Sequence, residues 1–127
     1  MRMATLVLAI PFLGVGASLA QMDAASPARP TGVQLFRQQC ATCHATNTTD
    51  AQRQGPSLAG VLGRKAGTLQ GFKYSQALAG ADFVWDDERL NAWLGNPQSV
   101  VPGAIMPYRQ ANADIRAAII GYLRELR

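Results

Sequence analysis

Histidine and cysteine are scarce in this sequence. One histidine and two cysteines occur in 127 residues, too few for a structural zinc site, which usually takes four nitrogen or sulfur ligands. Basic residues exceed acidic ones only by 12 to 8. Because no basic run accompanies this small excess, the chain lacks the signature of a nucleic-acid-binding protein. No useful stretch alternates apolar and polar residues, which argues against a β-sheet.

The scarce residues are gathered in one pentapeptide, Cys40-Ala41-Thr42-Cys43-His44. The pattern C-x-x-C-H is the attachment signature of c-type haem. Two thiols on a tight turn can add to the two vinyl groups of one porphyrin, and the adjacent imidazole can reach the iron. A thioredoxin-like dithiol would need a strand-rich context that does not precede Cys40. A disulfide within the motif would close a loop too short to stabilise much, and it would leave His44 unexplained.

The N-terminus predicts export from the cytoplasm. A Met-Arg-Met start, an apolar run over residues 4–17 and a small-x-small site at 18–20 are typical of a secretory signal peptide. The alternative is a retained membrane anchor, but the apolar run is short and contains Pro11. We therefore expect cleavage after Ala20.

We therefore divide the chain into three segments. Residues 1–20 are the predicted signal peptide, residues 21–30 a flexible lead-in, and residues 31–127 one small domain. Haem addition to C-x-x-C-H happens outside the inner membrane of bacteria. Export and motif together predict a bacterial periplasmic location, with no stable membrane insertion once the signal is cleaved.

Helical signals occur throughout the domain. Helices are predicted from residue 31 or 32 to the haem motif, near 75–79, from the acidic turn at 86–88 to Gly95-Asn96-Pro97, and from Asn112 onward. Segments 45–58 and 101–110 are predicted to be irregular, so something else must fill the core. If about 400 Å² of porphyrin is buried at about 25 cal/mol per Å², haem supplies about 10 kcal/mol.

Met106 is the candidate for a second iron ligand. The other three methionines lie within the first 22 residues, and no second histidine or third cysteine is present. Pro102 and Pro107 flank Met106 and favour a stiff loop. A core-filling thioether is the alternative role. Ligation by histidine and methionine would raise the reduction potential and leave no open coordination position, which favours electron transfer over oxygen or peroxide chemistry.

From Gly32 to the C-terminus the chain resembles the class I cytochromes c, close to the mitochondrial cytochrome c and its bacterial periplasmic relatives. Beyond C-x-x-C-H, the resemblance is carried by Gly55-Pro56-Ser57-Leu58, residues 60–67 (GVLGRKAG), Gly71-Phe72-Lys73-Tyr74, Trp85, Asn96-Pro97 and residues 102–106 (PGAIM). It implies a small all-α fold of about four to five helices around one haem c, bound covalently through Cys40 and Cys43.

The resemblance also implies roles around the haem. The Pro56 carbonyl would accept the free ring N–H of His44 and fix its orientation. Arg64, Tyr74 and Trp85 match positions whose donors meet the haem propionates, which need polar partners when buried. Plain core packing is the alternative role of Trp85. As a purely structural contact, the resemblance also implies that Gly32 and Phe36 cross the C-terminal helix at Ile119 and Tyr122.

Three residues depart from the mitochondrial pattern. Trp93 stands where a tyrosine is frequent, Ala104 where a hydroxyl is found, and Leu78 where an asparagine lies over the haem. We therefore expect fewer hydrogen bonds around the sulfur and the inner propionate. Lys65 and Lys73 are the only lysines, so the lysine ring around the haem edge is mostly missing.

The expected function is one-electron transfer by a monomeric periplasmic protein that is not an enzyme. Its partners would be a membrane respiratory complex, an oxidase or a dehydrogenase. One alternative is a dedicated haem subunit of a periplasmic dehydrogenase. Another is a haem peroxidase or gas sensor, which would require Met106 to leave the iron. The lack of a distal histidine counts against that reading.

Overall fold

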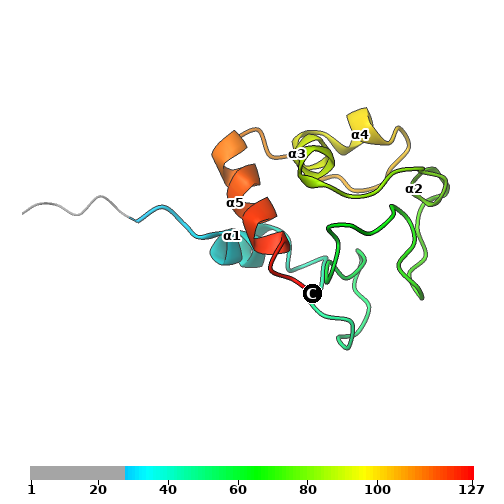
Figure 1. Ribbon diagram of the computed structural model, residues 1–127, viewed down its shortest axis with the longest axis horizontal. Coiled ribbons are helices and arrows are strands. Elements are labelled where there is room, and N and C mark those ends of the chain that lie inside the picture. Colours follow the sequence, from blue (N-terminus) through cyan, green and yellow to red (C-terminus); the bar gives the residue numbers. More distant parts are fainter. Residues whose placement is uncertain (1–27) are drawn as a thin grey trace, which may run out of the picture.

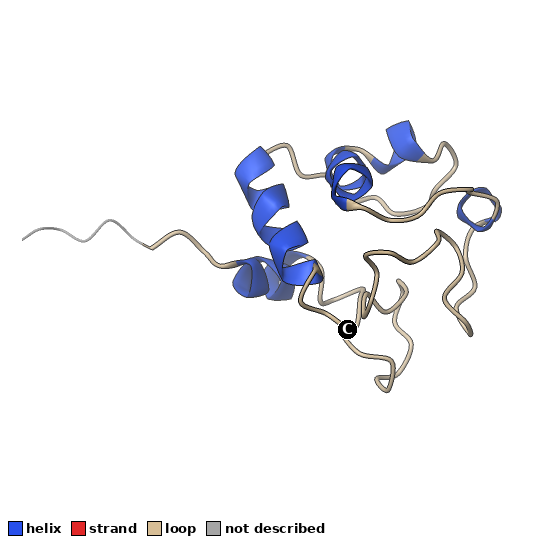
Figure 2. Cartoon of the chain, viewed as in Figure 1, coloured by secondary structure: helices blue, strands red, loops and turns tan. Residues whose placement is uncertain are grey.

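The computed structural model describes residues 28–127 (Figure 1). Within this range the chain has five helices and no strand (Figure 2). These are α1 (Gly32–Gln39), α2 (Gln76–Ala79), α3 (Asp87–Gly95), α4 (Pro97–Val100) and α5 (Ala113–Leu123). The predicted all-α class is confirmed. The predicted signal peptide and residues 21–27 of the lead-in lie outside the described residues.

Helix α1 begins where the sequence predicts. The Thr31 hydroxyl accepts a hydrogen bond from the Gln34 backbone N–H, and the Gln34 side chain accepts one from the Thr31 N–H. This reciprocal capping box satisfies two donors that the first helical turn leaves free. The helix ends at Gln39, and Cys40 is its C-cap, whose N–H donates to the Phe36 carbonyl at 2.8 Å. Helix α1 therefore leads directly into the C-x-x-C-H turn.

The first and last helices cross in close contact (Figure 1). Gly32 lies directly against α5, because a Cβ at this position would come within 2.2 Å of the Ala118 carbonyl oxygen. The Phe36 ring packs on Tyr122 at 5.2 Å between centroids, and Ile119 is only 1% exposed. The expected contact of Gly32 and Phe36 with Tyr122 is confirmed, and Ile119 is buried in the same core cluster as Phe36. This crossing closes one side of the core.

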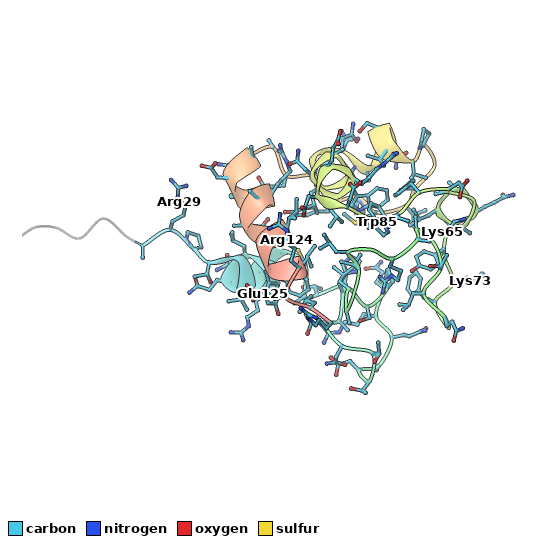
Figure 3. All side chains as sticks on the ribbon, in the orientation of Figure 1. Arg29, Lys65, Lys73, Trp85, Arg124 and Glu125 are labelled. Carbon is cyan, nitrogen blue, oxygen red and sulfur yellow. The ribbon has the colours of Figure 1, made fainter. Side chains whose placement is uncertain are left out.

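The C-terminal helix is shorter than its apolar pattern suggests. Asn112 caps it as predicted, accepting hydrogen bonds from the N–H groups of Asp114 and Ile115. It ends at Leu123, and Leu126 packs against the core from beyond the helix. Arg124 is the C-cap, and its guanidinium pairs with Asp87 of α3 at 3.0 Å. Figure 3 shows Arg124 near this end of α5.

Helices α3 and α4 form the part of the fold that precedes the Met106 loop. The Asp86 carboxylate accepts the Arg89 N–H and caps α3, and Leu90, Trp93 and Leu94 are its buried residues. The sequence predicts that Gly95-Asn96-Pro97 ends α3, and it does not predict the short α4. Pro97 is instead the first residue of α4, where a missing N–H costs nothing.

The irregular half of the domain is fixed by a short antiparallel contact. The Ala66 N–H donates to Phe83 and the Trp85 N–H donates to Arg64, each at 2.9 Å, around an isolated bridge between Lys65 and Val84. These bonds hold Arg64 and Trp85 next to each other. The short helix predicted near 75–79 is α2, which is capped by Ser75 and lies beyond this contact.

None of the helices within residues 28–127 is long and apolar enough to cross a bilayer.

Candidate cofactor site

A cavity of about 450 Å³ lies inside the helices and loops. Its lining is mostly apolar and comes from five regions: the C-x-x-C-H turn with the end of α1, residues 54–78, α3 with Trp85, the loop between α4 and α5, and α5 itself. All the predicted site residues line it, namely Cys40, Cys43, His44, Pro56, Arg64, Tyr74, Trp85 and Met106. The fold therefore brings residues that are up to 66 positions apart in the sequence into one site.

The two cysteines sit on the tight turn that the motif predicts. The N–H groups of Cys43 and His44 donate to the Cys40 carbonyl at 3.1 and 3.0 Å. The two cysteines form no disulfide within residues 28–127, and both line the cavity. Burial, with a smaller effect from the Cys43 charge, raises the pKa of Cys40 to about 11. The Cys40 thiol is thus held in apolar surroundings rather than as an exposed thiolate.

The imidazole of His44 is held by one hydrogen bond and one close packing contact. Its Nδ1 lies 2.8 Å from the Pro56 carbonyl oxygen, so Nδ1 carries the proton and Nε2 keeps its lone pair. Gly55 packs against the ring, because a Cβ there would lie 2.3 Å from Cε1. Burial lowers the pKa of His44, and the bond to Pro56 opposes that shift. The neutral imidazole is the form that binds metals.

Arg64, Tyr74 and Trp85 contribute to the polar part of the lining. The Arg64 guanidinium donates to the carbonyls of Ala59 at 3.0 Å and Ser57 at 2.9 Å, and burial lowers its pKa. Those bonds leave further N–H groups of the guanidinium for another acceptor. The Trp85 ring packs edge-on against Phe83 and Trp93. Trp85 therefore has both a core-packing role and a place in the cavity wall.

The residues that depart from the mitochondrial pattern also line the cavity. Leu78, Trp93 and Ala104 all face it, and neither Leu78 nor Ala104 can donate a hydrogen bond from its side chain. Residues that sequence reasoning missed are Gln39, Gln54 and Tyr108. The Tyr108 hydroxyl donates to the Gln39 side chain at 2.5 Å. The only sequence signal for Tyr108 was its place two residues after Met106.

The residues around the cavity fit a covalently attached haem. Two free thiols share a turn, the adjacent imidazole offers an unprotonated nitrogen, and a thioether lies in the same lining. The mostly apolar walls suit a porphyrin, and the Arg64 guanidinium offers donors to its acidic substituents. The fold and the site together define a small all-α protein of the c-type haem class.

Comparison with known proteins agrees with this class. The family model described as cytochrome c matches residues 30–127. Cytochrome c2 iso-2 of Magnetospirillum fulvum is 44% identical over 89 residues, covering 68% of this chain and 91% of that protein. Cytochrome c of Euglena viridis is 40% identical over 98 residues, covering 76% and 94%. Cytochrome c type-1 of Ascaris suum is 38% identical over 96 residues, covering 75% and 85%.

The chain belongs to the cytochrome c family. It is a haem protein of an electron-carrying family, and haem c is attached through Cys40 and Cys43, the only two cysteines in the sequence. The predicted class I cytochrome c fold and the predicted cofactor are both confirmed.

Proposed function

We propose that this protein is a periplasmic one-electron carrier, not an enzyme, with His44 and Met106 as the two axial ligands of its haem iron. The observation that carries the proposal is the shared cavity. It brings the free Nε2 of His44 and the thioether of Met106 together with the two attachment thiols. Met106 is also the only methionine in residues 28–127. Attached haem supplies one-electron chemistry, since its iron alternates between the ferrous and ferric states.

The protein's own residues set the conditions for that chemistry. Pro56 and Gly55 fix the His44 ring on one side of the cavity. The apolar lining excludes water, and a thioether ligand favours the ferrous state. If His44 and Met106 both held the iron, they would leave no open position for peroxide or dioxygen. These features favour outer-sphere electron transfer over a peroxidase or a gas sensor.

The propionate contacts are assigned to Arg64, Tyr74 and Trp85. All three line the cavity, and the antiparallel contact between segments 63–66 and 83–85 holds two of them together. The half-buried Arg64 is itself fixed by the carbonyls of Ser57 and Ala59. A guanidinium held in this way can meet a buried carboxylate without the cost of ordering a free side chain.

Export rests on the predicted signal peptide at residues 1–20, which leaves the lead-in at 21–30 and a haem domain at 31–127. A monomer in the periplasm would then exchange electrons with a respiratory complex, an oxidase or a dehydrogenase. A dedicated subunit of one dehydrogenase remains the second candidate, and co-purification at fixed stoichiometry would distinguish it from a free carrier.

Partner docking should depend only weakly on ionic strength. Lys65 pairs with Asp82 at 2.8 Å, and that ion pair holds the pKa of the Asp82 carboxyl below its usual range. Arg53 approaches Asp50. Figure 3 shows Lys65 and Lys73 at the end of the molecule that carries α2. This sparse distribution gives little long-range attraction to an acidic partner.

The optical spectrum of the purified protein tests the proposal. We expect the ferrous α band of a c-type haem and the weak long-wavelength ferric band of a methionine–iron bond. Rapid binding of carbon monoxide by the ferrous parent protein would contradict it, because that reaction needs an open coordination position.

A further inference from the structure

Met106 lies in a segment with very little backbone support. The Ala104 N–H donates to Val101 at 3.0 Å, and the Gln110 N–H donates to Leu94 at 2.8 Å. Between these two points, residues 105–109 form no backbone-to-backbone hydrogen bond within the described part of the chain. Figure 1 shows the segment as the orange connection between α4 and α5. Something other than the backbone must therefore fix the position of Met106.

Gln98 of α4 holds the chain before Met106. Its side-chain Oε1 accepts the Gly103 N–H at 3.1 Å, and its Nε2 donates to the Ala104 carbonyl. One carboxamide thus bonds a donor and an acceptor on neighbouring residues, which also fixes the orientation of the amide group. Gly103 has a φ of +90°, a conformation that a side-chain clamp helps to retain.

Tyr108 holds the chain after Met106. Its hydroxyl donates to Gln39 Oε1 at 2.5 Å, and the Gln110 side chain donates to the same oxygen at 3.1 Å. Gln39 is the last residue of α1 and directly precedes Cys40. The bond therefore links the Met106 loop to the cysteine turn, two segments 69 residues apart in the sequence.

We propose that Gln98 and Tyr108 are positioning residues that keep Met106 on the haem iron, one acting on each side of it. The proposal rests on the proposed ligation by Met106. It accounts for how the loop is held although Ala104 stands where the mitochondrial pattern has a hydroxyl group and Trp93 of α3 stands where it has a tyrosine. Gln98 holds the loop by bonding the backbone of Gly103 and Ala104, and Tyr108 holds it through its own hydroxyl. Neither Gln98 nor Tyr108 carries a charge.

Three variants of the full-length holoprotein test the proposal. Gln98→Leu and Tyr108→Phe keep the bulk of each side chain and remove its hydrogen bonds. Ser99→Ala is the matched control, because the Ser99 hydroxyl donates to the Asn96 carbonyl at 2.7 Å, within the α4 region, and forms no hydrogen bond to residues 101–110 of the described chain. The probe is imidazole, whose binding to ferric iron requires Met106 to leave.

Imidazole should bind on the order of tenfold faster to Gln98→Leu and roughly fivefold faster to Tyr108→Phe, given what such bonds contribute. The long-wavelength methionine–iron band should weaken in both variants. Ser99→Ala should match the parent in both measurements. Thermal unfolding of each variant shows whether a change is confined to the loop, as we propose, or follows general destabilisation, which would contradict it.

The Met106→Ala variant distinguishes a failure of the proposed Met106 ligation from a failure of the proposed positioning roles of Gln98 and Tyr108. One outcome is faster imidazole binding by Met106→Ala but the parent rate in Gln98→Leu and Tyr108→Phe. The proposed positioning roles would then be wrong, and the proposed ligation by Met106 would stand. If Met106→Ala leaves the spectrum and the rate of imidazole binding unchanged, the proposed ligation is wrong. The positioning roles of Gln98 and Tyr108 would then be wrong as well.

Discussion

The ring nitrogen Nδ1 of His44 lies 2.8 Å from the carbonyl oxygen of Pro56, while the preceding Gly55 packs against the same ring. Gly55 is itself fixed, because its N–H donates to the Cys43 carbonyl at 2.7 Å. The segment that orients the imidazole is therefore bonded to the turn that carries it. Orientation of a metal-binding histidine by such a partner is a common way to fix its tautomer.

Gly55→Ala should displace the His44 ring. A Cβ at this position would lie 2.3 Å from Cε1 and 2.6 Å from Nδ1, so the ring or the loop must move. We expect a loss of about 1 to 3 kcal/mol in the free energy of unfolding and an altered haem spectrum. Both are measured on the holoprotein by chemical denaturation and absorbance.

Gly121→Ala is the control for that substitution. Gly121 lies in α5, and a Cβ there would have no heavy atom within 4 Å. Alanine is favoured over glycine inside a helix by about 1 kcal/mol, so this variant should be neutral or more stable. Equal behaviour of Gly55→Ala and Gly121→Ala would contradict the packing of Gly55 against the imidazole.

Gly67→Ala should destabilise the protein more than Gly63→Ala. Both glycines have positive φ, +71° and +82°, so alanine costs about 1 kcal/mol of backbone strain at either position. At Gly67 the new Cβ would also come within 2.4 Å of the Leu78 carbonyl oxygen, whereas at Gly63 nothing lies within 4 Å. The difference in unfolding free energy between the variants therefore reports the contact with α2.

We expect the free energy of unfolding to fall by about 1 to 3 kcal/mol more in Gly67→Ala than in Gly63→Ala. Because Leu78 lines the cavity, this variant should also perturb the haem spectrum, and Gly63→Ala should not. Equal losses of unfolding free energy in the two variants would contradict the close approach of residue 67 to α2.

Replacing Cys40 and Cys43 together by alanine should remove covalent haem and leave the domain largely unfolded. The cavity of about 450 Å³ lies beside core residues such as Ile119 and Leu123. Without haem, these apolar walls face water, and a domain of this size has little other core to compensate. Circular dichroism and thermal melting of the double variant measure the effect. A cooperative, helical, haem-free protein would be the contrary result.

The helix starts could be predicted because their signals are local. Thr31, Ser75, Asp86 and Asn112 each cap the helix that follows, and a cap depends only on residues within a few positions. Helix α4 was missed for the opposite reason. Pro97 can end one helix or begin another, and the sequence alone did not decide which.

The candidate site could be predicted as far as single residues allow. Cys40, Cys43, His44 and Met106 stood out because their residue types are scarce in the sequence, and all four line the cavity. The roles of Pro56, Arg64, Tyr74 and Trp85 came only from the family resemblance. The bond between Tyr108 and Gln39 could not be predicted, because it depends on how an irregular loop returns to α1.

The reduction potential of the parent and of Met106→Ala, measured by optical redox titration, tests the central claim most directly. The account predicts a clearly lower potential in Met106→Ala, together with new binding of carbon monoxide to the ferrous protein, because the substitution removes a ligand that favours ferrous iron and vacates its position. An unchanged potential with no new ligand binding would contradict the assignment of Met106 to the haem iron.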